Sequence, residues 1–150
     1  MIEKELTRSV IGAFFEVYNA LGYGFLEHLY ATAMECELLA LGHRVAREIS
    51  VPVMYKGEHL GRQRLDMIVD DKLIVEIKST YQLPSVALRQ LYSYLSATNL
   101  EVGLLLHFGP EPKFYRQVAH KIQRLLSVSD PLHPPNPNPN FMESPEAVEP

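Results

Sequence analysis

The sequence predicts a protein of the α/β class, an α+β fold in which helices flank one mixed sheet, with the element order ααβββαββ. Two observations predict it. Apolar residues recur at helical spacing over roughly the first 41 residues, and the period then changes to the alternation of strands. Another stretch with helical spacing, residues 86–98, interrupts the strands. The chain has 150 residues, which corresponds to one domain.

Two amphipathic helices are expected near the N-terminus. The first covers about residues 7–21, and Gly22 supplies a C-terminal stop. The second covers about residues 26–41 and ends at Gly42. The apolar stripes of the two helices consist of Val10, Phe14, Val17, Leu21, Tyr30, Met34, Leu38 and Leu41.

Three strands are expected next. Residues 47–55 alternate apolar and polar side chains, and Lys56-Gly57 forms a turn. The following strands cover residues 58–69 and 72–79. The polar break between them, Asp70-Asp71-Lys72, has the length of a hairpin loop.

One helix and two strands complete the expected body. Pro84-Ser85 opens a helix over about residues 86–98, with Ser85 as a suitable N-cap. This helix is apolar on most sides, so we expect it to be buried or to cover the sheet. Residues 102–108 are apolar throughout and predict a central strand. Residues 113–118 predict a fifth strand, and residues 119–126 a short closing helix.

Three charged side chains interrupt the apolar pattern of the second and third strands: Asp66, Glu76 and Lys78. Burying an unpaired charge costs several kcal/mol. Because side chains alternate between the faces of a strand, Glu76 and Lys78 share one face. Asp66 shares a face of its own strand with Arg64 and Ile68. Charges kept at this cost are expected to serve chemistry.

The hairpin register predicts that two of these charges meet. If the three polar residues form the loop, Val69 pairs with Leu73 and Asp66 lies opposite Glu76. Carboxylates placed side by side are destabilising unless something neutralises them, which a divalent metal ion would do. The alternative is a cross-strand salt bridge on a half-exposed sheet, with Arg64 as the compensating charge.

The C-terminal segment differs in composition from the body. Residues 127–150 contain seven of the eleven prolines and predict a disordered or extended tail with polyproline II character. Residues 1–126 contain all 14 Lys and Arg and 14 of the 18 Asp and Glu, so the tail carries the whole net charge of −4. A neutral body is not typical of strong nonspecific binding to a duplex.

Arginines are the candidates for a local basic groove, and a solvated scatter of arginines is the alternative. Among them we assign substrate contacts to Arg64 and Arg89. The five candidates are Arg44, Arg47, Arg62, Arg64 and Arg89.

Cysteine usage and the N-terminus bear on location. Cys36 is the only cysteine, so no internal disulfide can form, which fits a reducing cytoplasm. Its apolar neighbours on the second helix predict a buried thiol. No signal peptide is visible, and no apolar run approaches the ~20 residues of a membrane span. We therefore expect a cytoplasmic protein without membrane contact. The six histidines lack zinc-site spacing such as H-E-x-x-H.

Four short motifs follow one another along the chain. They are "GFLEHLY" at residues 24–30, Asp66 with Glu76-Ile77-Lys78, the pair Gln90 and Tyr94, and "GLLLHFG" at residues 103–109. Together they resemble the PD-(D/E)XK nuclease superfamily. The Gln-x-x-x-Tyr pair is similar to the RecB-like and λ-exonuclease-like branch, and Gly-x-x-Glu-x-x-Tyr to the bacterial GxxExxY proteins. The resemblance covers roughly residues 5 to 118.

The resemblance implies a restriction-endonuclease-like core over residues 1–126 and a Mg²⁺-dependent nuclease, with Mn²⁺ as a substitute. Asp66 and Glu76 would bind the metal, together with the carbonyl of Ile77. Glu27 would join from the second helix, directly or through water. The alternative for Glu27 is a carboxylate that stabilises the N-terminal end of a helix.

The resemblance also implies catalytic roles for Lys78, Gln90 and Tyr94. Lys78 would position or deprotonate the attacking water. Gln90 and Tyr94 lie four residues apart on one helix face and would hold a phosphate or brace Lys78. Their alternatives are a solvent-facing amide and a core aromatic. Tyr30 is expected to pack in the core rather than to contact substrate.

His107 stands where the resembled group has asparagine, and we expect a hydrogen-bonded histidine at the rim of the site. The substrate would be nucleic acid, with DNA favoured over RNA, and a homodimer or a protein partner would be compatible. The alternative function is a noncatalytic nucleic-acid or protein-interaction module that retains the fold.

Overall fold

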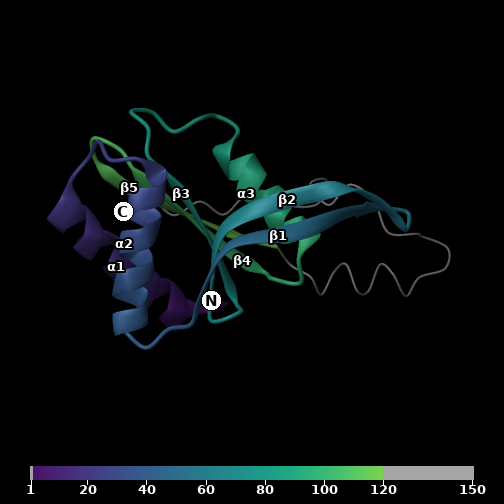
Figure 1. Cartoon of the computed structure of the whole chain (residues 1–150), viewed down its shortest axis with the longest axis horizontal. Coiled ribbons are helices and arrows are strands. Elements are labelled where there is room, and N and C mark those ends of the chain that lie inside the picture. The colour runs from purple at the N-terminus through teal and green to yellow at the C-terminus, as the bar shows by residue number, and fades with distance from the viewer. Residues whose placement is uncertain (1, 120–150) are drawn as a thin grey trace.

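A computed structural model describes residues 2–119, and this part of the chain contains three helices and one five-stranded sheet (Figure 1). The elements follow the predicted order ααβββαββ, so the predicted fold class is confirmed. The proposed tail (127–150) and nearly all of the proposed closing helix (119–126) lie outside the described residues. None of the helices in the described part is long and apolar enough to cross a membrane.

Helices α1 (Lys4–Leu21) and α2 (Glu27–Ala40) lie side by side and cover one face of the sheet (Figure 1). The predicted stripe of α2 is buried through Tyr30, Met34 and Leu38. The prediction of a buried Cys36 is wrong, because the thiol is exposed. Cys36 is two residues from both Met34 and Leu38, which corresponds to a rotation of about 200° around the helix axis. It therefore lies opposite the buried stripe and faces solvent.

The sheet has the order β1-β2-β3-β4-β5 and is mixed. Its strands are β1 (Val45–Tyr55), β2 (Glu58–Val69), β3 (Leu73–Lys78), β4 (Val102–Phe108) and β5 (Pro112–Val118). Only β3 and β4 pair in parallel, and α3 (Ala87–Ala97) connects them. The predicted pair Val69–Leu73 is confirmed. β4 is an inner strand and is buried along its whole length, whereas β3 is the middle strand.

Helix α3 packs on the opposite face of the sheet and encloses a second apolar cluster. Leu91 and Leu95 of α3 contact this cluster together with Ile74 of β3 and Leu105 of β4. The expected N-cap at Ser85 is wrong: Val86 occupies the cap position, and no side chain caps the helix there. The stability of α3 therefore comes from burial of its apolar side rather than from its N-terminus.

Strands β1 and β2 form a long ribbon that extends beyond the rest of the sheet (Figure 1). The backbone of β1 has a local bend at Glu48, which lies in the left-handed region with a φ of 52°. The β1–β2 register itself shifts further along, between Val53 and Met54. The pairing of β1 with β2 continues on both sides of Glu48 but skips the Glu48–Asp66 position. Across this point the buried side chains change partners: Met67 joins the cluster under α1 and α2, and Leu65 joins the cluster under α3. The bend therefore places Asp66 between the two cores.

The side chains of Ser9, His43 and Asp70 connect α1 with the segments that follow α2 and β2. Ser9 Oγ lies 2.7 Å from His43 Nε2, and His43 Nδ1 lies 2.7 Å from the Asp70 carboxylate. The other Asp70 oxygen accepts a hydrogen bond from the backbone N–H of Arg44. The order of groups is that of a serine hydrolase. However, Ser9 lies inside α1, where its backbone N–H serves the helix ladder and cannot act as an oxyanion donor. We interpret the connection as structural.

Asp70→Asn should weaken this connection in a pH-dependent way. Burial raises the pKa of Asp70, but the hydrogen bonds from Arg44 and His43 outweigh it and leave the pKa below its ordinary value. The carboxylate therefore stabilises the fold above the unfolded pKa of about 3.9, and this contribution is lost as pH falls through the lower folded pKa. We expect Asp70→Asn to cost about 1–2 kcal/mol at pH 7 and much less near pH 3.

Urea unfolding at several pH values measures this difference. Asp71→Asn is the matched control, because Asp71 is its exposed neighbour and pairs only with the exposed Arg44 side chain. A cost of Asp70→Asn that stays constant from pH 7 to pH 3, or that equals the cost of Asp71→Asn, would contradict the interpretation.

Candidate active site

The carboxylates of Asp66 and Glu76 each accept a backbone hydrogen bond from the opposite strand at the point where β2 and β3 separate. The backbone pairing of β2 with β3 ends at Met67–Val75. One residue further, Glu76 Oε1 accepts a hydrogen bond of 2.9 Å from the Asp66 backbone N–H. Asp66 Oδ2 in turn accepts one of 2.8 Å from the backbone N–H of Ile77. Side-chain carboxylates thus replace the backbone acceptors of the ladder, and each carboxylate is held by the opposite strand.

The surroundings of Asp66 and Glu76 disfavour a negative charge on both carboxylates at once. Glu76 is 4% exposed. Burial, followed by the nearby charge of Asp66, raises the pKa of Glu76 to about 8, although the charge of Lys78 and the hydrogen bond from the Asp66 backbone oppose the shift. A side-chain hydrogen bond with Asp66 also favours the protonated form of Glu76. Two carboxylates this close lose their repulsion by holding one proton or one cation between them.

Helix α3 brings two polar side chains to the same place. Lys78 Nζ donates to Gln90 Oε1 at 3.4 Å. Gln90 also hydrogen-bonds to Tyr94, which is one turn further along the helix. Burial first, and then the charges of Glu76 and Asp66, raise the pKa of Tyr94 to about 12, so its hydroxyl stays protonated near neutral pH. The structure thus brings these five residues into one cluster.

Tyr30 holds the loop between α1 and α2. Its side chain is fully buried and stacks on Phe108 with ring centroids 4.1 Å apart. Its hydroxyl donates to the carbonyl of Gly22 and accepts a hydrogen bond from the backbone N–H of Phe25. Gly24 lies between these two contacts with a φ of 117°, which favours glycine. Core packing of Tyr30 was predicted, but this use of its hydroxyl was not.

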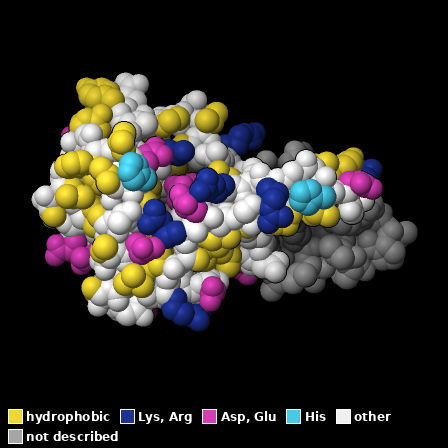
Figure 2. Space-filling model, in the orientation of Figure 1, with side chains coloured by type: hydrophobic (Ala, Val, Ile, Leu, Met, Phe, Trp, Pro, Cys, Tyr) yellow, Lys and Arg dark blue, Asp and Glu magenta, His cyan; other side chains and the backbone are white. Residues whose placement is uncertain are grey.

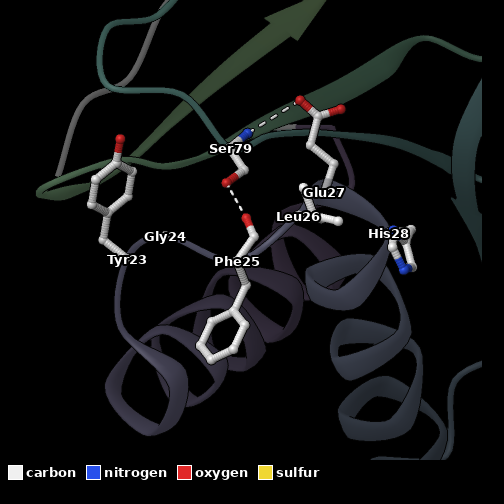
Figure 3. A pocket seen from close by; sticks show the side chains of 7 residues that line it. All are labelled: Tyr23, Gly24, Phe25, Leu26, Glu27, His28 and Ser79. Atoms are coloured by element: carbon white, nitrogen blue, oxygen red, sulfur yellow. Dashed lines mark hydrogen bonds between the residues drawn. The ribbon is translucent and has the colours of Figure 1, made fainter.

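Glu27, the first residue of α2, faces the end of β3. Its Oε2 accepts a hydrogen bond of 3.3 Å from the backbone N–H of Ser79, and the Ser79 hydroxyl donates to the carbonyl of Phe25 (Figure 3). Glu27 also lines a cleft of about 160 Å³ together with Asp66 and Ile77. The cleft is also lined by His28, Ala31, Arg47 and Glu48.

Arg47 and Glu48 are cleft residues that the motifs did not single out. Arg47 pairs with Glu35 at 3.7 Å, and its Nε is buried without a hydrogen-bond partner among the described residues. What brings attention to them is the irregular backbone at Glu48, and this feature is visible only in the structure.

The two arginines assigned to substrate are both exposed. Arg64 is exposed on β2 and pairs with Glu48 at 2.9 Å, and Arg89 is exposed on α3. Arg44 and Arg47 also pair with carboxylates. On the face seen in Figure 2, basic side chains alternate with acidic ones and form no continuous basic patch.

His107 is buried rather than at the rim, which corrects the expected position. It is 5% exposed and pairs with Lys78 across β3 and β4. His107 Nε2 lies 2.9 Å from the carbonyl oxygen of Thr80, while Nδ1 has no hydrogen-bond partner among the described residues. His107 thus holds the segment that follows Lys78.

The residues of the cluster fit a magnesium ion of low protein coordination. No group of three or more His, Cys, Asp or Glu side chains within residues 2–119 is arranged to hold a metal ion. Glu27 lines the same cleft as Asp66. Magnesium commonly binds one or two carboxylates and completes its shell with water and phosphate oxygens. A close carboxylate pair with a raised Glu76 pKa has the donor chemistry and the excess negative charge for such an ion.

Comparison with known proteins adds a family to this geometry. The family model described as "PD-(D/E)XK nuclease superfamily" matches residues 4–121. No curated protein matches the chain. A solved structure described as "Crystal structure of SSO0001" is 20% identical, with a TM-score of 0.48, over 95% of this chain and 70% of that chain. The family match spans every described helix and strand, including the split between β2 and β3. This chain belongs to the PD-(D/E)XK nuclease superfamily.

Proposed function

We propose that the protein is a metal-dependent nuclease of the GxxExxY kind, which hydrolyses phosphodiester bonds of nucleic acid, with DNA favoured over RNA. The observation that carries the proposal is the pair of carboxylates, Asp66 and Glu76, each held by a backbone N–H of the opposite strand, with Lys78 beside them. A salt bridge made for stability would not place two carboxylates together in a buried position. Superfamily membership supports the same reaction class.

In this proposal Asp66, Glu76 and the carbonyl of Ile77 hold Mg²⁺ or Mn²⁺, and Glu27 contributes directly or through water. When bound, the ion polarises the phosphate and lowers the pKa of a water molecule. The backbone bonds to Asp66 and Glu76 fix both carboxylates before any ligand arrives, so little ordering is needed on binding.

Lys78 acts on the attacking water and on the charge that develops at phosphorus. Gln90 accepts the hydrogen bond of the Lys78 ammonium group and restricts where it points. Tyr94 stays protonated near neutral pH and can donate through its hydroxyl to a phosphate oxygen. The three residues therefore form the side of the site that faces α3.

A noncatalytic binding module is the second candidate, and the ion pairs of the arginines favour it. Arg44, Arg47 and Arg64 each pair with a carboxylate, which reduces their attraction for a phosphate backbone. Divalent metal binding distinguishes the two candidates, because only the nuclease needs the ion.

Asp66→Asn and Lys78→Ala should fail in different ways. Asp66→Asn removes a charged ligand, so affinity for Mg²⁺ or Mn²⁺ should fall together with cleavage. Lys78→Ala removes a positive charge near the carboxylates, so metal affinity should persist or rise while cleavage drops by roughly 10²- to 10⁴-fold. Calorimetric metal titration and cleavage assays on single- and double-stranded DNA and RNA measure both effects.

The exposed residues Asp71 and Lys72 provide matched controls for this pair of variants. Asp71→Asn and Lys72→Ala should leave metal affinity and cleavage unchanged. An equal loss of metal affinity in Asp66→Asn and Lys78→Ala would assign Lys78 a structural role. If the wild type binds neither ion at millimolar concentration, the binding module replaces the nuclease.

Tyr30→Phe should reduce cleavage although the hydroxyl is not placed among the reacting groups. The change keeps the stacking on Phe108 but removes the hydrogen bonds to Gly22 and Phe25, so the loop that leads into Glu27 loses its fixed position. We expect a stability loss of about 1–2 kcal/mol and a fall in cleavage at saturating Mg²⁺, measured by melts and by kcat.

Tyr55→Phe at the end of the β1–β2 ribbon is the control for loss of a tyrosine hydroxyl. A Tyr30→Phe protein that is destabilised but cleaves at the wild-type rate under native conditions would show that the loop position does not matter for catalysis.

A further inference from the structure

A second pocket lies beside the cleft, between the α1–α2 loop and the end of β3 (Figure 3). Its volume is about 580 Å³, within the range of about 300–1,000 Å³ that is typical of small-molecule sites. The residues that line it are Tyr23, Gly24, Phe25, Leu26, Glu27, His28 and Ser79. None of the roles proposed above uses this space apart from that of Glu27.

The pocket and the cleft share residues Glu27 and His28. Glu27 lines the cleft with Asp66 and Ile77 on one side, and it lines the pocket with Tyr23 and Ser79 on the other. A nucleic-acid strand whose phosphate lies at the cleft would therefore extend an adjoining group into the pocket.

The pocket presents aromatic surface to solvent. Tyr23 is 44% exposed. The ring of Phe25 is also exposed, but it points away from Ser79 and lies 6.0 Å from the ring of Tyr30, so Tyr23 supplies the free aromatic face (Figure 3). In Figure 3 the ring of Tyr23 stands at one end of the pocket, away from the Glu27 carboxylate. Exposed aromatic rings on a nucleic-acid enzyme provide stacking platforms for unpaired bases of any sequence.

The aromatic residues are carried by a fixed backbone. Tyr30 bonds to both Gly22 and Phe25, and the Ser79 hydroxyl donates to the carbonyl of Phe25. Ser79 directly follows Lys78, so the loop is tied to the strand that carries the catalytic groups. A platform held in place before binding loses little conformational entropy when a base stacks on it.

We infer that this pocket binds an unpaired nucleobase next to the scissile phosphate, and that the substrate is single-stranded or frayed nucleic acid. The inference rests on the proposed nuclease function. A base inside a duplex is already stacked and paired, so reaching Tyr23 would cost a few kcal/mol of unstacking. The paired arginines offer little phosphate attraction to offset that cost. Stacking of a base on Tyr23 therefore supplies affinity for nucleic acid that the charges of the neutral body do not supply.

Tyr23→Ala in the full chain tests the inference. The probes are a fluorescein-labelled 12-nucleotide single-stranded DNA of mixed sequence and the blunt duplex of the same sequence. Binding is followed by fluorescence anisotropy in EDTA, and cleavage is followed by initial rates in Mg²⁺. Loss of one stacking contact should weaken single-strand affinity roughly 5- to 150-fold, which corresponds to about 1–3 kcal/mol.

Three further measurements make the test specific. Tyr23→Phe keeps the ring and should retain most of the affinity. Tyr55→Ala removes an aromatic side chain of similar exposure, 49%, at the far end of the ribbon and should have little effect. Metal affinity of Tyr23→Ala should equal that of the wild type, because Tyr23 does not line the cleft.

The outcomes separate the inference from the proposed function. If the wild type cleaves nucleic acid but Tyr23→Ala behaves like Tyr55→Ala, the nucleobase pocket is wrong and the nuclease proposal stands. Equal binding and cleavage of the single strand and the blunt duplex by the wild type would overturn the substrate class in the same way. A wild type that binds Mg²⁺ but neither binds nor cleaves either probe overturns both.

Discussion

The two hydrogen bonds that hold the carboxylates of Asp66 and Glu76 across β2 and β3 are the constraint on which the rest of the structure depends. Each carboxylate accepts a backbone N–H of the opposite strand, so the pair continues the β2–β3 ladder after the backbones have separated. Beyond this separation β2 stays paired with β1, whose backbone is left-handed at Glu48, and β2 passes between the two apolar clusters. The same separation opens the cleft that Glu27 lines. The separation of β2 from β3 therefore shapes both the fold and the candidate site.

Burial of this pair opposes the stability of the fold. The raised pKa of Glu76 means that the metal-free protein keeps a proton on that carboxyl at neutral pH, because two charges are not accommodated there. The two backbone hydrogen bonds prevent the carboxylates from turning away to solvent. The carboxylates cannot separate, so a proton relieves their repulsion in the metal-free protein, and a cation would relieve it when bound.

Much of this architecture can be predicted from sequence because it depends on local patterns. The length of the polar break fixed the Val69–Leu73 register, and from it the meeting of Asp66 and Glu76 could be inferred. The left-handed Glu48 and the Ser9–His43–Asp70 connection could not be inferred in this way. Both depend on residues brought together by tertiary packing, which leaves no period or spacing in the sequence.

The Gly-x-x-Glu-x-x-Tyr motif acts as one mechanical unit. Gly24 allows the backbone to take a left-handed turn, and Tyr30, one helical turn after Glu27, reaches back to hold the loop on both sides of that glycine. Glu27 is then fixed between the cleft and the aromatic pocket. Because the hydroxyl of a buried core residue sets the position of an exposed loop, rigidity is transmitted from the Phe108 stack to the substrate side of the site. The spacing of the motif is therefore a requirement of geometry: a tyrosine one residue earlier or later would face another side of α2.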